Sequence, residues 1–136
     1  MKPRYLLDSD VFSLMVKGLD EGINGRMHKL AQGEAALSVV TTGEFFYGVS
    51  HAPVSKLRDQ RARRLLDFFG VLPITAEVAP VYGKIRADLR AQGTPIGPND
   101  LWLAAQAKAL GLVMVTRNSR EFKRVTGLKV EDWATP

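Results

Sequence analysis

Several carboxylate and amide side chains stand where apolar runs of this sequence end, and together they could hold a divalent cation. In YLLDSDVFS, Asp8 and Asp10 follow one apolar run directly, and Glu44 follows another in LSVVTTGEFF. Asp100 opens an Ala-rich stretch, and Asn118 follows the apolar run after that stretch. Carboxylate and amide oxygens without His or Cys suit a hard cation such as Mg²⁺ or Mn²⁺. Carboxylates held close together also repel strongly unless a cation lies between them.

Each of these side chains also has a local structural explanation. Asp8 is a preferred helix N-cap, and Thr41-x-x-Glu44 has the spacing of a capping box. Asp100 would lie in the first turn of a helix, where an acid interacts favourably with the helix dipole. Asn118 could cap a short turn. Local spacing alone therefore leaves both capping and cation binding open.

Short apolar runs bounded by Gly, Pro, Asp or Thr predict buried strands. Four runs are distinct and the last is weaker: Arg4–Leu7, Ala35–Val39, Val71–Ile74, Leu112–Val115 and Leu128–Val130. Their apolar residues are continuous rather than alternating, which is typical of strands that helices cover on both faces.

Helical patterns lie between these runs. Apolar residues recur at helical spacing from Val78 to Leu89, and less regularly within Val54–Phe69. The stretch Pro98–Leu110 has Pro at its start and is followed by Gly111. Alternating strands and helices indicate an α/β domain with a mainly parallel sheet. Sites in such sheets form beyond the carboxyl ends of the strands, where the acids above are found.

The composition narrows the class of protein. With 136 residues, 46% hydrophobic and 24% charged, the chain has the balance of one globular domain spanning residues 1–136. It has no cysteine, which excludes a disulfide scaffold and a thiolate zinc site. No apolar run could span a bilayer, and acids come too early for a signal peptide, so we expect a cytoplasmic protein. The formal net charge of +5 favours a polyanionic partner.

Beyond these patterns, parts of the sequence resemble the VapC-type PIN-domain toxins, the ribonuclease components of bacterial type II toxin–antitoxin modules. They are YLLDSDVFS, LSVVTTGEFFYGV, IRADLRAQGTPIGPNDLWLAAQAKALGL and MVTRNSREFKRVTGLKVEDW, in the order and at the spacing of that family. The resemblance runs from Tyr5 to Trp133, and its last two motifs are the most specific. It implies a PIN-like three-layer α/β/α domain with a central, mainly parallel sheet of four to five strands.

The resemblance also implies a role for each site residue. Asp8 and Asp100 match the acidic metal ligands of the family, which implies Mg²⁺ or Mn²⁺ as the cofactor. Glu44 matches its second acid, which acts on the metal through water or a nearby contact. Thr116 matches a small hydroxyl residue beside the site, and Asn118 stands where many relatives have a fourth Asp. The implied reaction is hydrolysis of an RNA phosphodiester by metal-activated water.

Asp10 departs from the family pattern. The first motif of the family is commonly Asp-Thr-Asn or Asp-Ser-Asn, whereas this chain has Asp8-Ser9-Asp10. A carboxylate in place of the amide adds negative charge to the metal pocket. We expect Asp10 to support Glu44 in positioning or deprotonating the attacking water.

The resemblance implies several partners. RNA, expected to be tRNA or another structured RNA, would contact basic side chains, with Arg86 and Arg117 as the best candidates. A cognate antitoxin would bind across the acidic groove, and antitoxins of this type often present an Arg to the carboxylates. Toxins of this type usually form homodimers, for which Phe46, Tyr47 and the helix over residues 54–69 are candidate contacts.

Two other functions fit parts of the sequence. A haloacid-dehalogenase-like phosphatase also begins with an apolar strand and Asp-x-Asp, and Asp8 would then be its nucleophile. Its late acidic pair has only Glu131 and Asp132 as counterparts, which lie very near the C-terminus. The other alternative is a non-catalytic RNA- or protein-binding domain whose acids only cap helices.

Overall fold

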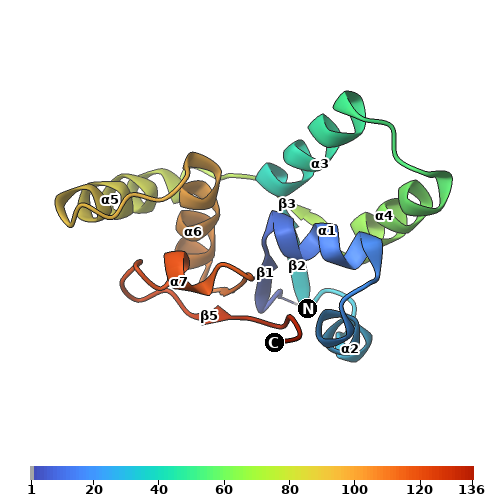
Figure 1. The fold of residues 1–136 in the computed structure, drawn as a ribbon. Helices are drawn as coiled ribbons and strands as arrows, with labels where there is room; N and C mark the ends of the chain where they lie inside the picture. The colour runs from blue at the N-terminus through green and yellow to red at the C-terminus, as the bar shows by residue number, and fades with distance from the viewer. Residues whose placement is uncertain (1) are drawn as a thin grey trace.

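The computed structural model describes residues 2–136, which form a parallel five-stranded sheet and seven helices (Figure 1). The strand order is β3-β2-β1-β4-β5, and all four pairings are parallel. The strands are β1 (Tyr5–Leu7), β2 (Ala35–Ser38), β3 (Val71–Leu72), β4 (Val113–Val115) and β5 (Val130–Glu131). The helices are α1 (Ser9–Lys17), α2 (Glu21–Lys29), α3 (Val39–His51), α4 (Lys56–Phe69), α5 (Val78–Ala91), α6 (Pro98–Leu110) and α7 (Ser119–Phe122). Within the described residues, no helix has the length and apolar character needed to cross a membrane.

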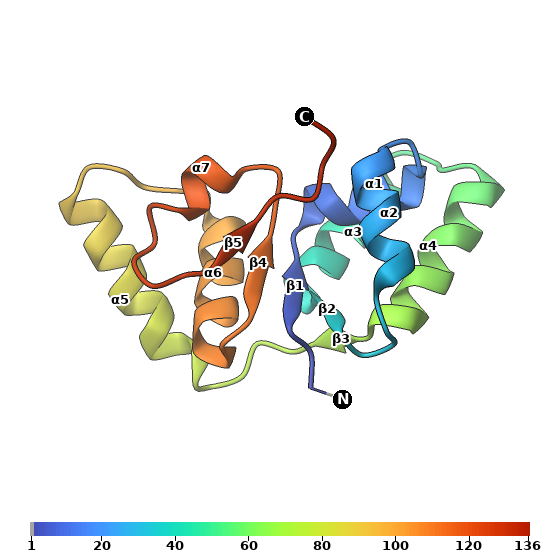
Figure 2. The same ribbon diagram turned by 90° about the horizontal axis from the view of Figure 1, so that it is seen from below.

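The sheet separates two apolar layers. Successive residues of β1 alternate between them, since Tyr5 and Leu7 pack with α1, α2 and α4 while Leu6 packs with α5, α6 and α7. Figure 2 shows these two groups of helices on opposite sides of the strands. Because helices cover both faces, the central strands are apolar at every position. The expected three-layer α/β/α architecture with a parallel sheet is confirmed.

Each predicted strand is present, with differences at the ends. β3 stops at Leu72, before Pro73, which has no amide hydrogen to donate to a neighbouring strand. β5 begins at Val130, later than expected, because a turn over residues 125–128 comes first. In that turn the Leu128 amide donates to the Val125 carbonyl at 3.3 Å.

Helix α3 begins earlier than the capping-box spacing suggests. Its N-cap is Ser38, whose Oγ accepts a hydrogen bond from the Val40 amide at 3.1 Å. Thr41 lies inside the first turn and is buried, so the predicted capping box of Thr41 and Glu44 is wrong. Glu44 follows in the next turn, where it caps nothing and is exposed.

The C-terminal residues tie α2 to the sheet. The ring of Trp133 is buried and meets the Tyr5 ring edge-on, with 5.1 Å between their centroids. The Arg26 guanidinium lies 4.5 Å from the centroid of the Trp133 ring and pairs with Glu131 at 3.2 Å. Glu131 also accepts a hydrogen bond from Trp133 Nε1 at 2.9 Å. These contacts hold α2 against the segment that follows β5.

Gly22→Ala should destabilise the protein, because this segment leaves no room for a methyl group. A Cβ on Gly22 would lie 2.5 Å from the Trp133 carbonyl oxygen and 2.9 Å from the Thr135 amide nitrogen. Since both are backbone atoms, the chain must shift, and we expect a loss of roughly 1–3 kcal/mol in the free energy of unfolding. The measurement is unfolding in urea.

Gly25→Ala is the matched control, since it lies in the same helix and a Cβ there meets nothing within 4 Å. It should leave the free energy of unfolding unchanged or raise it by up to about 1 kcal/mol, because alanine is the better helix former. Equal destabilisation by both substitutions would show that the close approach at Gly22 is not the cause.

Candidate active site at the carboxyl edge of the sheet

Asp8 stands at the junction of β1 and α1, in the centre of the sheet edge. Its amide donates to the Val115 carbonyl at 3.0 Å, which continues the pairing of β1 with β4. Its Oδ1 accepts a hydrogen bond from the Val11 amide at 2.9 Å, so Asp8 is the N-cap of α1. The residue is only 4% exposed. The capping explanation for Asp8 is therefore correct, but capping does not explain why this carboxylate is buried.

Burial raises the pKa of Asp8 to about 6. Hydrogen bonds with the Thr116 side chain and with the backbone of α1 act in the opposite direction, while the charges of Asp10 and Asp100 raise the pKa further. Thr116 is fully buried after β4, and its Oγ1 accepts a hydrogen bond from the Asn118 amide at 2.8 Å. Thr116 therefore connects Asp8 to the turn that follows β4.

Asp100 reaches the same edge from α6. It lies in the first turn of this helix, two residues after Pro98, and its side chain is half-buried. Burial raises the pKa of Asp100 to about 6, and the charges of Glu121, Glu44 and Asp10 raise it further, in that order of size. The acids that act on Asp100 thus come from α1, α3 and α7. The structure thus gathers the predicted acids at one edge.

Glu121 is a member of this cluster that the sequence did not suggest. It has the largest charge effect on Asp100. Its Oε2 accepts a hydrogen bond from the Asn118 side-chain amide. Asn118 is the N-cap residue of α7, as the capping explanation expects, but its side chain makes no capping bond to the helix backbone and is left for Glu121. The only sequence signal for Glu121 is an acid three residues after Asn118, in the turn before the buried Phe122.

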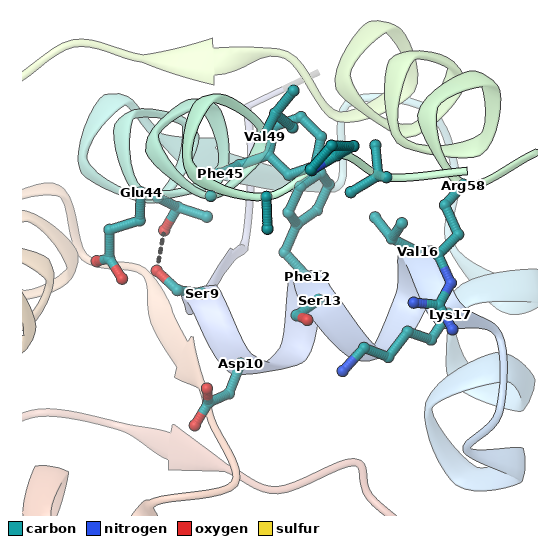
Figure 3. A pocket seen from close by; sticks show the side chains of 15 residues that line it. Ser9, Asp10, Phe12, Ser13, Val16, Lys17, Glu44, Phe45, Val49 and Arg58 are labelled. Atoms are coloured by element: carbon teal, nitrogen blue, oxygen red, sulfur yellow. Dashed lines mark hydrogen bonds between the residues drawn. The ribbon is translucent and has the colours of Figure 1, made fainter. Parts of the chain in front are cut away.

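Glu44 and Asp10 form the exposed rim of the cluster. The Oε1 of Glu44 accepts a hydrogen bond from the Asn99 side-chain amide at 3.2 Å, which links α3 to the first turn of α6. Figure 3 shows Glu44 on α3 and Asp10 on α1 on either side of Ser9, whose hydroxyl lies 3.4 Å from that of Thr41. The acidic rim thus extends from the first turn of α1, which carries Asp10, to the second turn of α3, which carries Glu44.

A groove of about 510 Å³ extends from this rim between α1, α3 and the segment before α4. Its apolar wall is formed by Phe12 and Val16 of α1, Phe45 and Val49 of α3, and residues 52–54. Asp10 and Glu44 lie at one end, whereas Lys17 and Arg58 lie at the other (Figure 3). The groove therefore has an acidic end, an apolar middle and a basic end.

The donor set suits a hard divalent cation but does not form a closed cage. Its carboxylate and amide oxygens are the ligands that Mg²⁺ prefers. Within residues 2–136, however, no three side chains of His, Cys, Asp or Glu lie close enough together to hold a metal ion. The expected cage of three carboxylates is therefore not formed by the side chains as they lie. Since Mg²⁺ commonly takes one or two carboxylates and keeps several waters, Asp8 and Asp100 still fit it.

The two predicted RNA-contacting arginines lie in different layers. Arg117 is exposed in the turn between Thr116 and Asn118, beside the acidic cluster. Arg86 is exposed on α5, where its Nη1 donates a hydrogen bond to Tyr82 Oη at 3.2 Å. Both side chains are accessible to a polyanion.

Comparisons with known proteins agree on one family. The model of the PIN domain matches residues 5–128. The chain is 34% identical to a tRNA(fMet)-specific endonuclease VapC from Shigella flexneri, over 96% of this chain and 98% of the relative. It is 32% identical to ribonuclease VapC2 from Haemophilus influenzae, over 96% of this chain and 98% of that relative. A DNA-bound VapBC from Salmonella typhimurium is similar in structure, with a TM-score of 0.88 and 32% identity over 97% of this chain and 99% of that chain.

Asp8→Asn should stabilise the protein at pH 7 in the absence of divalent cations. Its folded-state pKa is raised from 3.8 to about 6, so above pH 6 the ionised carboxylate opposes folding by about 2–3 kcal/mol. That penalty fades as the pH falls from 7 towards 4, because the carboxyl of the folded state takes up its proton first, near pH 6. Asn also remains a good N-cap. Urea unfolding in the presence of a chelator should therefore show that Asp8→Asn has a higher free energy of unfolding than the parent at pH 7. This difference should shrink at lower pH.

Asp20→Asn is the matched control, because Asp20 caps α2 as Asp8 caps α1. Hydrogen bonds, led by that from the Ile23 amide, lower the pKa of Asp20. A lowered pKa means that the ionised form favours folding, so Asp20→Asn should reduce stability at pH 7, and the loss should shrink as the pH falls below the ordinary pKa of 3.8. Destabilisation by Asp8→Asn at pH 7 would contradict the proposed burial penalty.

Proposed function

The chain belongs to the PIN-domain family, and we propose that it is a Mg²⁺-dependent endoribonuclease toxin of the VapC type. The observation that carries the proposal is the convergence of Asp8 and Asp100, both with a raised pKa, on one edge of the sheet. Similarity to relatives named as ribonucleases, over nearly the whole chain, supports the same function. Such an enzyme would act on RNA in the cytoplasm.

The phosphatase and the non-catalytic binding domain, the two alternative functions, explain fewer of these observations. Family membership argues against a haloacid-dehalogenase-like phosphatase with Asp8 as nucleophile. A non-catalytic domain would need its acids only as caps, and Asp8 does cap α1. However, Asp100 and Glu44 cap no helix in the part of the chain that the structure describes. Buried acids with a raised pKa, such as Asp8 and Asp100, reduce stability, and such groups are typical of functional sites.

Asp8 and Asp100 would hold the cation, with the Thr116 hydroxyl keeping the Asp8 carboxylate in place. When bound, Mg²⁺ neutralises charge on the phosphoryl oxygens and lowers the pKa of a water in its shell. Glu44 would accept the proton of the attacking water, with Asp10 in support. The hydrogen bond from Asn99 holds the Glu44 carboxylate between α3 and α6.

Asn118 would orient a phosphate oxygen through its side-chain amide. Its hydrogen bond to Glu121 fixes the direction of that amide, and its backbone bond to Thr116 fixes the turn. Arg117, the next residue along, would contact a neighbouring phosphate. We propose initiator tRNA as the first substrate to test, because the relative from Shigella flexneri is named as specific for tRNA(fMet).

An antitoxin segment would occupy the groove between α1 and α3. The solved neighbour from Salmonella typhimurium is a VapBC assembly, and the resemblance implies an antitoxin as the partner of the toxin. Phe12, Phe45 and Val49 line the groove, which suits an apolar segment. Asp10 and Glu44 at its end would pair with an Arg of that segment. Binding there would cover Glu44, the proposed general base, and keep RNA out of the site.

A second copy of the chain would pack against the other face of α3. Val39, Val40, Gly43 and Tyr47 line a shallow hollow on that face. Val39 is 45% exposed and Tyr47 is 69% exposed, so an apolar stripe on this helix is uncovered in the single chain. We therefore propose α3 as the homodimer contact to test first, with α4, where Leu57 is also exposed, as the alternative.

Asp8→Asn and Asp100→Asn should each reduce RNA cleavage by roughly 100-fold or more, since each removes a proposed cation ligand. Purified protein is incubated with initiator tRNA and with other tRNAs, with Mg²⁺ or with a chelator, and the products are resolved on a sequencing gel. Cleavage should require Mg²⁺ and be fastest for initiator tRNA.

Asp67→Asn is the charge-matched control, because Asp67 is exposed on α4 and far in sequence from the site. It should cleave like the parent. Cleavage by a folded Asp100→Asn variant at the parental rate, or no cleavage of any RNA by the folded parent, would reject the proposal.

Tyr47→Glu should convert the protein from dimer to monomer, because it places a charge in the apolar face of α3. Leu57→Glu on α4 tests the alternative contact, since Leu57 is 60% exposed and similarly apolar. Sedimentation of both variants gives the masses. A monomeric Leu57→Glu variant beside a dimeric Tyr47→Glu variant would move the interface to α4.

A further inference from the structure

A second cavity, of about 440 Å³, lies between α5 and the beginning of α6. Its apolar floor consists of Leu89, Ile96 and Leu101, and Arg86 and Arg90 stand at its rim. This volume is in the range of pockets that hold small organic ligands, and a nucleotide is a ligand of that size. An apolar floor below two cations suits the flat base and the charged phosphate of a nucleotide.

The rim of the cavity is held in place by an aromatic stack. The rings of Tyr82 and Trp102 are nearly parallel, at 15°, with 3.8 Å between their centroids. The Tyr82 hydroxyl accepts the hydrogen bond from Arg86 at 3.2 Å, so the stack also orients the guanidinium. A cation that is already positioned loses less entropy when it meets a phosphate.

The charge of this cavity is opposite to that of the acidic end of the α1–α3 groove. No acidic residue contributes to its lining. Within residues 2–136, neither Arg86 nor Arg90 forms a salt bridge. Asp10 and Glu44, by contrast, line the groove between α1 and α3. The cationic rim of this cavity therefore attracts a polyanion without the opposing carboxylates that line the near end of the α1–α3 groove.

The cavity is also next to the candidate active site. Leu101 in its floor directly follows Asp100 in α6. The Pro95 carbonyl accepts a hydrogen bond from Arg124 Nη1 at 3.4 Å. This bond ties the loop that lines the cavity to the residues after α7, the helix that carries Glu121. A nucleotide in the cavity would thus be close to the phosphate under attack.

We propose that this cavity binds one unpaired nucleotide of the RNA substrate, with its base on the floor of Leu89, Ile96 and Leu101 and its phosphate at Arg86 and Arg90. The assignment rests on the proposed ribonuclease function. The cavity would then select the nucleotide that flanks the cleaved bond, because phosphate contacts alone carry no sequence information. Unpaired bases are the parts of RNA that proteins read most readily.

The test measures binding rather than cleavage, so that it stands apart from the nuclease reaction. Asp8→Asn protein in a chelating buffer is titrated with oligoadenylate and with an abasic oligomer of the same length. We expect oligoadenylate to bind about tenfold more tightly, because the abasic chain has no base to bury. Ile96→Trp, which fills the cavity, should bring the ratio close to one.

Arg90→Ala should weaken binding of both oligomers alike and reduce the slope of log affinity against log salt by about 0.7. Lys84→Ala is the matched control, since Lys84 lies on the same helix and pairs with Asp88 at 3.1 Å. It should leave both the ratio and the salt slope as they are. Arg90 is exposed, so its replacement tests the site even where Ile96→Trp fails to fold.

The nucleotide site would be overturned if folded Ile96→Trp kept the parental ratio of affinities for oligoadenylate and the abasic oligomer. It would also be overturned if Arg90→Ala and Lys84→Ala had equal effects on affinity and salt slope. A change of sedimentation mass in Ile96→Trp, with RNA binding intact, would instead show an interface between copies of the chain and would also overturn it. If the parent cuts no RNA while the binding ratios behave as expected, the nuclease proposal fails and the nucleotide site stands.

Discussion

The burial of two carboxylates beside other acids at the carboxyl edge of the sheet is the constraint on which the rest of the structure depends. Burial first, and then the charges of neighbouring acids, raise the pKa of Asp8 and of Asp100, so ionising either one at this edge costs free energy. The fold offsets part of that energy. Helices α1 and α6 both begin at this edge, so the positive ends of two helix dipoles face the acids. The excess of negative charge that remains is the feature on which the proposed cation site rests.

The parallel sheet and the predicted acids could be read from the sequence because their causes are local or periodic. β1, β2 and β4 are continuous apolar runs, and a parallel sheet requires their ends to meet at one edge. The local sequence around each acid, however, does not decide whether that acid caps a helix or belongs to a functional site. Asp8 caps α1 and is also buried within the acidic cluster, so the two explanations were never exclusive for this residue. For Glu44 the capping explanation failed, because Ser38 had already begun the helix.

The features that sequence could not supply are those that depend on contacts between distant parts of the chain. Glu121 lies on a helix of one turn, which has no periodicity to recognise, and its neighbour Asp100 comes from another element. The hydrogen bond between Asn99 and Glu44 joins residues 55 positions apart. The cavity beside α5 likewise combines residues of two helices and the loop between them. Each requires the relative placement of helices, which packing rather than local preference decides.

The first turn of α6 has a consequence for how this protein can vary. Three consecutive residues there face three different neighbours. Asn99 donates a hydrogen bond to Glu44 of α3, and the pKa of Asp100 is raised by the charges of acids on α7 and α3. Leu101 forms part of the cavity floor. Successive side chains on a helix are about 100° apart. Inserting or deleting a single residue within α6 after Leu101 would rotate all three away from their neighbours at once, relative to the rest of the helix. Length variation in evolution should therefore be confined to the loop before Gly97, where added residues leave the phase of the helix intact.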